Sequence, residues 1–515
     1  MAPNGLSTGL VDTGPPQDHR APPDAAPSGG SPGAMEASLA VLFAGICGFL
    51  SSGPIADNSL LTHLATGRLQ VSGGLPVGNP FLAGVGEFPV PSWWWSGALG
   101  WAERFAGLGA VRLLTVVVAA GLGALVVRAG RPDGPVSGGA RVPVVAPVAQ
   151  ALASVLVLSV LFPWLNARPH LGGFVLLAVT LVVWRERHSP WWLVPVFGIW
   201  INVHGSWLHA VVVLAVLWLG ESLDSRSLDP LRLRYAAACG LGLVGGALLY
   251  PQPFALLLLP ADQAGDPLAR SVLRSYHEWG PASPGSPLLW TFVLLALVAL
   301  VPLLGRPRKG GSHRFGSLLV VLAATAMGLG AMRVMPLAAI VLAPFAAGGA
   351  LTLLDGRGPS PMARGARWVG AGCVVAGLLL GTAAVVRIQG TAHTNLARYP
   401  VDEVEWLAER DLVANDAVTV IHNDWVGNYL EYRFGEEANA WVDDRPPVRR
   451  MADYVTLRGM ADGWEQVLHD ADPDVVLWQR SDPLPAELAA RAQWHPALTT
   501  DRFLVLCHER IAASC

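Results

Sequence analysis

Residues 113–127, LLTVVVAAGLGALVV, decide the fold class of this chain. They hold no charged residue and lie between Arg112 and Arg128. An apolar run of about 20 residues is long enough to cross the hydrocarbon core of a bilayer as a helix. The whole protein is 52% hydrophobic and 14% charged, whereas soluble domains carry roughly 25% charged residues. The stretch therefore predicts a membrane-spanning helix.

Comparable apolar runs recur along most of the chain. Each can supply roughly 17–25 residues. They begin near Ala37, Val111, Val144, Leu171, Trp191, Ser206, Tyr235, Leu288, Ser317, Pro336 and Trp368. We therefore expect an α-helical polytopic membrane protein with about eleven transmembrane helices.

Composition divides the chain into three parts. Residues 1–34 are rich in Pro, Gly, Ala and Ser, so they predict a disordered tail, with Met35 as an alternative start. Residues 35–387 form the predicted transmembrane domain. The first apolar run has no basic segment before it, which favours a retained helix over a cleaved signal peptide. Residues 388–515 have the composition of a soluble domain.

The C-terminal part alternates between helix and strand patterns, which predicts a small α/β domain. The predicted strands are residues 417–422, 439–442, 475–478 and 503–507, and the predicted helices are residues 401–409, 426–434, 451–458 and 464–470. Cys507 and Cys515 would either form a disulfide or remain free thiols. The cysteines include no CxxC pair and the chain has no basic tract, so we expect neither a zinc or iron–sulfur site nor nucleic-acid binding.

Basic residues divide unequally between alternate loops. One set of loops holds Arg128, Arg131, Arg141, Arg185, Arg187, Arg226, Arg232, Arg234, Arg306, Arg308, Lys309, Arg314, Arg357, Arg364 and Arg367. The other set holds Arg68, Arg104, Arg112, Arg168, Arg270, Arg274 and Arg333. Because basic loops stay in the cytoplasm, we predict a plasma-membrane protein with a cytoplasmic N-terminus. An odd number of spans then places residues 388–515 outside the cell.

In the predicted outer loop 55–110, residues 59–71 predict an amphipathic helix, and residues 93–101 contain a tryptophan cluster. The tryptophans would form an interfacial belt. Asp57 precedes the amphipathic pattern. It would either cap that helix or act as a carboxylate at the outer face, as a general base or beside a divalent cation.

Other polar residues accompany the predicted outer turns, where ionisable groups near a bilayer usually have a role. They are His63, Arg168, His170, Asn202, His204, Glu278 and Arg333. Arginine is well suited to phosphate, so Arg168 and Arg333 are candidate phosphate ligands. The alternatives are interfacial anchoring for Arg168 and His170, helix packing for Asn202 and His204, and a loop ion pair with Arg274 for Glu278.

Several of these segments resemble one group of bacterial membrane proteins. They are residues 57–68 (DNSLLTHLATGR), 166–170 (NARPH), 200–206 (WINVHGS), Glu278-Trp279, 333–337 (RVMPL) and 442–445 (VDDR). The group is the GT-C-type glycosyltransferases that use polyprenyl-phosphate sugars. The resemblance implies catalytic roles for Asp57 and Glu278, and substrate binding by His63, Arg168, His170, Asn202, His204 and Arg333. The usual second acidic residue is replaced by Ser59.

The resemblance thus implies an inverting glycosyltransferase at the outer face of the plasma membrane. Its partners would be a polyprenyl-phosphate-linked sugar donor, an envelope glycan or lipid acceptor, and membrane lipids. No cofactor is required by this interpretation, although a divalent cation would suit an acidic site. Two alternatives remain: a non-catalytic envelope scaffold, consistent with Ser59, and a lipid flippase or transporter.

Overall fold

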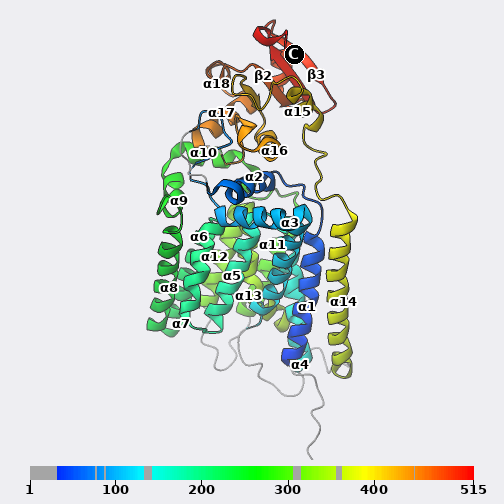
Figure 1. The fold of residues 1–515 in the computed structure, drawn as a ribbon. Coiled ribbons are helices and arrows are strands. Elements are labelled where there is room, and N and C mark those ends of the chain that lie inside the picture. The colour runs from blue at the N-terminus through cyan, green and yellow to red at the C-terminus, as the bar shows by residue number, and fades with distance from the viewer. Residues whose placement is uncertain are drawn as a thin grey trace, which may run out of the picture.

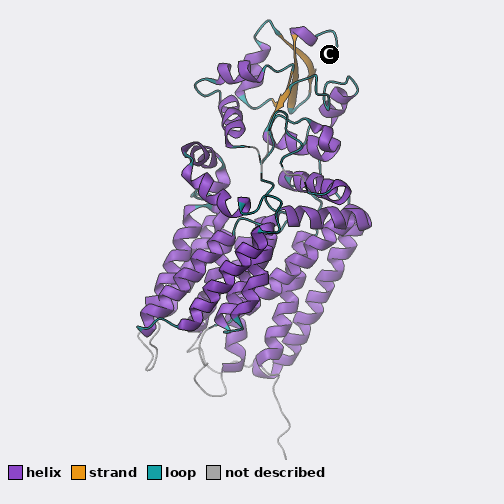
Figure 2. Cartoon of the chain, turned by 60° about the vertical axis from the view of Figure 1, so that its left-hand side comes forward, coloured by secondary structure: helices purple, strands orange, loops and turns teal. Residues whose placement is uncertain are grey.

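The computed structural model describes residues 32–75, 78–85, 89–132, 142–304, 315–354, 362–445 and 447–515. A bundle of long helices forms one end of the molecule, and a small unit built around a β-sheet lies beyond the other end of that bundle (Figure 1). The predicted tail, residues 1–34, falls mostly outside the described residues. Figure 2 shows that the strands are confined to the C-terminal unit.

Seven of the described helices are long and apolar enough to cross a membrane. They lie within α1 (Pro32–Ser51), α3 (Trp93–Ala129), the segment from α4 (Val142–Leu161) to Trp164, α7 (Trp207–Ser225), α11 (Pro287–Leu304), the segment from Met332 through α13 (Met335–Leu354), and α14 (Met362–Gly390). Three shorter apolar helices are α5 (Pro169–Arg185), α6 (Leu193–Val203) and α12 (Phe315–Gly330). With α8 (Pro230–Ala247), a helix covers each of the predicted apolar runs, but the number of about eleven spans remains a prediction.

Charged loops of the first predicted set meet at one end of the bundle. Arg128 forms ion pairs with Glu186 and Glu36, and Arg187 lies 3.6 Å from Asp229. This end lies opposite the C-terminal unit (Figure 1). The two sets of loops therefore occupy different ends, while their orientation in a cell membrane remains a prediction.

Two helices lie across the end of the bundle nearest the C-terminal unit. The first is α2 (Asn58–Gly73), and the second is the beginning of α3, whose backbone leaves helical geometry at Ala106 and Gly107 before α3 turns into the bundle. A Cβ atom on Gly67 would lie 2.1 Å from the carbonyl oxygen of Ser96, so only glycine permits this close approach.

The helix predicted at residues 59–71 is confirmed as α2. Its surroundings, however, differ from those of an amphipathic helix at a membrane interface. Every residue from Leu60 to Gly67 is buried. The reason is that α2 packs against α3 on one side and against α16 (Asp424–Phe434) of the C-terminal unit on the other. Arg68 joins all three elements through a bidentate pair with Glu103 and a 2.8 Å bond to the Tyr432 carbonyl.

The tryptophan cluster is only partly an interfacial belt. Trp95 is buried and donates to the Ala167 carbonyl, and Trp93 donates to Asn202. Trp101 is 61% exposed. The first two therefore serve packing between α3 and the neighbouring helices, because their indole N–H groups are satisfied inside the protein.

The C-terminal unit contains a four-stranded sheet with the order β1-β2-β4-β3. Strands β1 (Val420–His422) and β2 (Val475–Gln479) are parallel, whereas β4 (Phe503–His508) is antiparallel to both β2 and β3 (Trp494–Thr499). Helices α15 (Val401–Ala408), α16, α17 (Val448–Gly459), α18 (Trp464–Ala471) and α19 (Pro483–Ala489) surround it. A disulfide joins Cys507 to Cys515.

One predicted strand is wrong, and one observed strand was not predicted. Residues 439–442 are not part of the sheet, because Ala440 pairs instead with the predicted outer loop, accepting from Ala83 N and donating to the Phe81 carbonyl. The sequence interpretation also missed β3, where Pro496 interrupts the strand pattern. The predicted strands at residues 417–422, 475–478 and 503–507 correspond to β1, β2 and β4.

Candidate functional site

Asp57 and Arg168 form the centre of a charged cluster at the end of the bundle nearest the C-terminal unit. Arg168 Nε donates to Asp57 Oδ1 across 2.5 Å, and Arg168 Nη2 donates to Asn58 Oδ1 across 3.0 Å. Asp57 occupies the N-cap position of α2 but makes no capping hydrogen bond with its side chain. Its carboxylate is thus directed to the arginine rather than to the helix terminus. The side chains of Asp57 and Arg168 are 20% and 17% exposed.

Glu278 links this pair to Arg333. One carboxylate oxygen lies 3.5 Å from Arg168 Nη1, and the other lies 3.8 Å from Arg333 Nη1. The guanidinium of Arg333 also lies 5.2 Å from the centre of the Trp279 ring. Four of the predicted site residues therefore meet, although they come from four separate segments of the chain.

Arg333 keeps unused hydrogen-bonding capacity. Its ion pair with Glu278 is long, its side chain is 34% exposed, and it makes no hydrogen bond to the residues that the structure describes. Guanidinium N–H groups in this state are suited to a phosphate, which can accept two of them at once. Around Arg168, the carboxylates of Asp57, Glu278 and Asp444 raise the pKa of the guanidinium against the effect of burial, so it stays charged.

The histidines lie close to this cluster but are occupied by other partners. His63 Nδ1 lies 2.8 Å from Ser96 Oγ, His170 Nε2 lies 2.9 Å from the Trp164 carbonyl, and His204 Nδ1 lies 2.8 Å from Ser206 Oγ. Burial and the nearby charges of Arg445, Arg168, His204 and Arg333 hold the pKa of His63 well below its usual value. His63 is therefore neutral at pH 7.

Asn202 is fully used in packing. Its Oδ1 accepts from Trp93 Nε1, and its Nδ2 donates to the carbonyls of Gly198 and Gly246. These bonds join α3, α6 and α8, so they correspond to the helix-packing alternative for this residue.

The C-terminal unit contributes Asp444, which the sequence interpretation did not select. The Asp444 carboxylate interacts electrostatically with the guanidinium groups of Arg168 and Arg333 and with the hydroxyl of Ser59. Burial and the adjacent Asp443 raise the pKa of Asp444 to about 6. The available signal was the motif at residues 442–445, two carboxylates and an arginine directly after an apolar segment.

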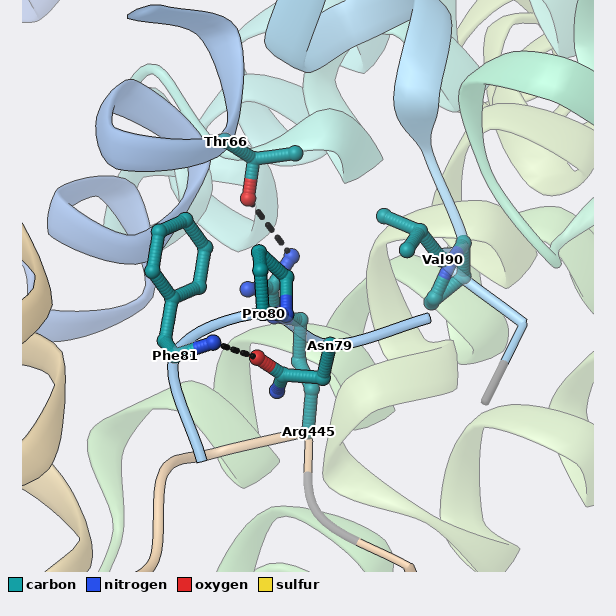
Figure 3. A pocket seen from close by; sticks show the side chains of 7 residues that line it. Thr66, Asn79, Pro80, Phe81, Val90 and Arg445 are labelled. Atoms are coloured by element: carbon teal, nitrogen blue, oxygen red, sulfur yellow. Dashed lines mark hydrogen bonds between the residues drawn. The ribbon is translucent and has the colours of Figure 1, made fainter. Parts of the chain in front are cut away.

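A second buried cluster lies behind Asp444. Asp443 accepts from Asn79 Nδ2 across 2.8 Å and from the backbone N–H of Arg445 across 2.7 Å. Arg445 donates to Thr66 Oγ1 across 3.2 Å and lies 3.8 Å from Glu431. Figure 3 shows Thr66, Asn79 and Arg445 around a small pocket that Pro80, Phe81 and Val90 also line.

The described residues do not fit the predicted option of a divalent cation. Within them, no three His, Cys, Asp or Glu side chains are grouped closely enough to hold a metal ion. Asp57, the carboxylate proposed for that role, has an arginine as its nearest charged neighbour.

Comparison with known proteins shows similarity at the level of the fold. The chain is similar to the archaeal oligosaccharyltransferase AglB from Archaeoglobus fulgidus, solved with an inhibitory peptide and a dolichol-phosphate, with a TM-score of 0.52 and 11% identity over 86% of this chain and 69% of AglB. Against ArnT from Cupriavidus metallidurans bound to undecaprenyl phosphate, the TM-score is 0.48 with 14% identity over 94% of this chain and 98% of ArnT. No protein-family model and no curated protein sequence matches the chain. The likeness to AglB shows a shared membrane-protein fold.

Proposed function

We propose that this protein is a membrane glycosyltransferase that moves a sugar from a polyprenyl-phosphate donor to an envelope glycan or lipid at the outer face of the plasma membrane. One observation carries the proposal: Asp57, Arg168, Glu278 and Arg333 converge at one end of the helical bundle. The AglB-like fold supports it, because AglB is an oligosaccharyltransferase solved with a dolichol-phosphate.

The two arginines would hold the donor phosphate. Arg333 makes no side-chain hydrogen bond to the described residues and its side chain is one-third exposed, while Arg168 is held by Asp57 and Asn58. Fixed positive charge near a departing phosphate stabilises the charge that develops in the transition state. We propose that Asp57 and Glu278, the carboxylates of the membrane part, align these two arginines. The acceptor hydroxyl needs a general base in the same site.

Direct transfer tests this function. The protein in lipid nanodiscs would receive a tritiated polyprenyl-phospho-mannose or polyprenyl-phospho-glucose, with membranes from a deletion strain as the acceptor. We expect label to enter a product that is absent without the protein. Asp57→Asn should reduce transfer by at least about tenfold, because the amide does not carry the charge that orients Arg168.

A non-catalytic envelope scaffold is the second candidate. It is favoured by the pairing of Asp57 and Glu278 with Arg168, since these charges compensate one another. The same assay separates the two functions. A scaffold would transfer no label, yet its deletion would still alter the envelope, and Asp57→Asn would restore the envelope as well as the parent chain does.

A further inference from the structure

Asp444 brings a carboxylate of the C-terminal unit into the charged cluster of the membrane part. This carboxylate interacts electrostatically with Arg168, with Arg333 and with the hydroxyl of Ser59 at the start of α2. Ser59 occupies the position where the resemblance leads one to expect a second acidic residue. The structure therefore places an acidic side chain beside this position from a segment far away in the sequence.

The backbone of Asp444 is fixed on both sides. Its N–H donates to Asn428 Oδ1 across 3.1 Å. The preceding residue, Asp443, is fully buried and is held by Asn79 and by the Arg445 backbone. A side chain on a backbone held in this way has a defined position, as a reacting group requires.

The carboxylate itself differs from the other two in the cluster. Asp57 accepts a 2.5 Å hydrogen bond from Arg168, and Glu278 lies between Arg168 and Arg333. Asp444 Oδ1, by contrast, is buried and has no hydrogen-bond partner among the residues that the structure describes. A buried polar atom without a partner is costly, and a catalytic role is one of the physical reasons for which such an atom is retained.

We propose that Asp444 is the general base of the transfer reaction, with its free Oδ1 receiving the proton of the acceptor hydroxyl. This inference rests on the proposed function and changes the role of Asp57, which becomes the residue that orients Arg168. In the step, the hydroxyl O–H bond breaks and its proton moves to Asp444. The oxygen forms a bond to the anomeric carbon, and the bond between that carbon and the phosphate oxygen breaks. The electron pair stays on the polyprenyl phosphate, next to Arg168 and Arg333.

The electrostatic surroundings suit this task. The Asp444 carboxylate interacts with two sets of groups. The charged form is disfavoured by the negative or ionisable groups of Asp443, Tyr276 and Tyr399. It is favoured by Arg445, Arg168, Arg333 and the Ser59 hydroxyl. With a pKa of about 6, Asp444 is ionised at pH 7 but remains a stronger base than an ordinary aspartate. A general base works best when its pKa lies near the operating pH.

The experiment compares kcat/KM for sugar transfer against pH in four proteins: the parent chain, Asp444→Asn, Ser59→Ala and Asp470→Asn. In the parent, kcat/KM should fall below about pH 6 as Asp444 becomes protonated, which gives the profile an acidic limb. Asp444→Asn should lower kcat/KM by about 10²–10⁴-fold and abolish this limb. Ser59→Ala should stay active and move that limb to higher pH, because the lost hydroxyl normally lowers the Asp444 pKa. Asp470→Asn makes the same chemical change on an exposed carboxylate of α18 and should match the parent.

The outcomes separate this inference from the proposed function. A parent chain that transfers no sugar overturns both. An active parent whose Asp444→Asn variant keeps its activity and its acidic limb overturns the role of Asp444 alone. If Ser59→Ala leaves the limb in place, the titrating group is not the carboxylate next to Ser59, and the assignment is wrong even when Asp444→Asn fails to fold.

Discussion

Asn79 donates a 2.8 Å hydrogen bond to the buried carboxylate of Asp443, which lies 364 positions later in the chain. Beside it, the backbone of Ala440 pairs with Phe81 and Ala83. A segment of the membrane part thus holds the strand-like residues of the C-terminal unit, and this contact sets the position of Asp444.

Removal of this contact should loosen the C-terminal unit. In Asn79→Ala, the buried carboxylate of Asp443 loses a donor, which costs about 1–3 kcal/mol or more for a charged group. We expect a lower melting temperature and faster proteolysis between the two parts of the purified protein. Gln466→Ala, which removes an exposed amide from α18, is the control. Equal melting temperatures for both variants would show that the Asn79 bond does not stabilise the docked arrangement.

Arg333 should contribute to donor binding. Arg333→Gln removes a charged partner of phosphate, and hydrogen bonds to charged groups contribute about 1.5–3 kcal/mol. We therefore expect roughly a 10–100-fold weaker affinity for a polyprenyl phosphate, measured by binding to the protein in nanodiscs. Arg333→Lys should recover part of this loss, because it restores the charge without the bidentate geometry. Unchanged affinity in Arg333→Gln would remove Arg333 from the donor site.

Glu431 should make stability depend on pH. Its carboxyl is fully buried, and neither oxygen has a hydrogen-bond partner among the described residues. Burial, and then the charge of Asp443, raise the pKa of Glu431 well above its usual 4.5, against the opposing charge of Arg445. Between pH 4.5 and the folded-state pKa, the folded chain keeps this proton while the unfolded chain loses it. The free energy of unfolding therefore falls as the pH rises through this window.

Glu431→Gln tests this dependence. The amide cannot ionise, so the variant should melt at a higher temperature than the parent at pH 7, while the difference should shrink towards pH 4.5. The measurement is thermal unfolding of the purified protein at several pH values. A variant that melts lower than the parent at pH 7 would show that Glu431 is ionised there and that its pair with Arg445 stabilises the fold.

The predicted orientation can be tested by cysteine labelling in intact cells. Ser227 is exposed in the turn between α7 and α8. Glu436 is exposed directly after α16, a helix that lies beyond the opposite end of the bundle (Figure 1). A membrane-impermeant thiol reagent should label Glu436→Cys and not Ser227→Cys. The parent chain is the control for its own thiols. Cys47 and Cys239 are buried, Cys507 and Cys515 form a disulfide, and Cys373 is half-buried in α14, so the Cys373→Ser background is labelled in parallel. The reverse pattern would place the candidate site in the cytoplasm.

The amino-acid sequence by itself determined the membrane class, the position of the apolar helices and the alternation of helix and strand after residue 396. These are local properties. A helix satisfies its own backbone hydrogen bonds, so the length of an apolar run is enough to predict a span. The sequence also singled out Asp57, Arg168, Glu278 and Arg333, because charge is rare beside such runs.

Only the tertiary structure decided which polar groups meet. Nothing in the local pattern distinguishes an Asp57 that caps α2 from one that binds Arg168, because that choice depends on a residue 111 positions away. In the same way, residues 439–442 read as a buried strand, but their partner is the segment around Phe81 and not the sheet. This pairing places Asp444 in the cluster. Such contacts between distant segments depend on the packing of the whole chain and produce no periodic pattern in the sequence, so the local sequence could not predict them.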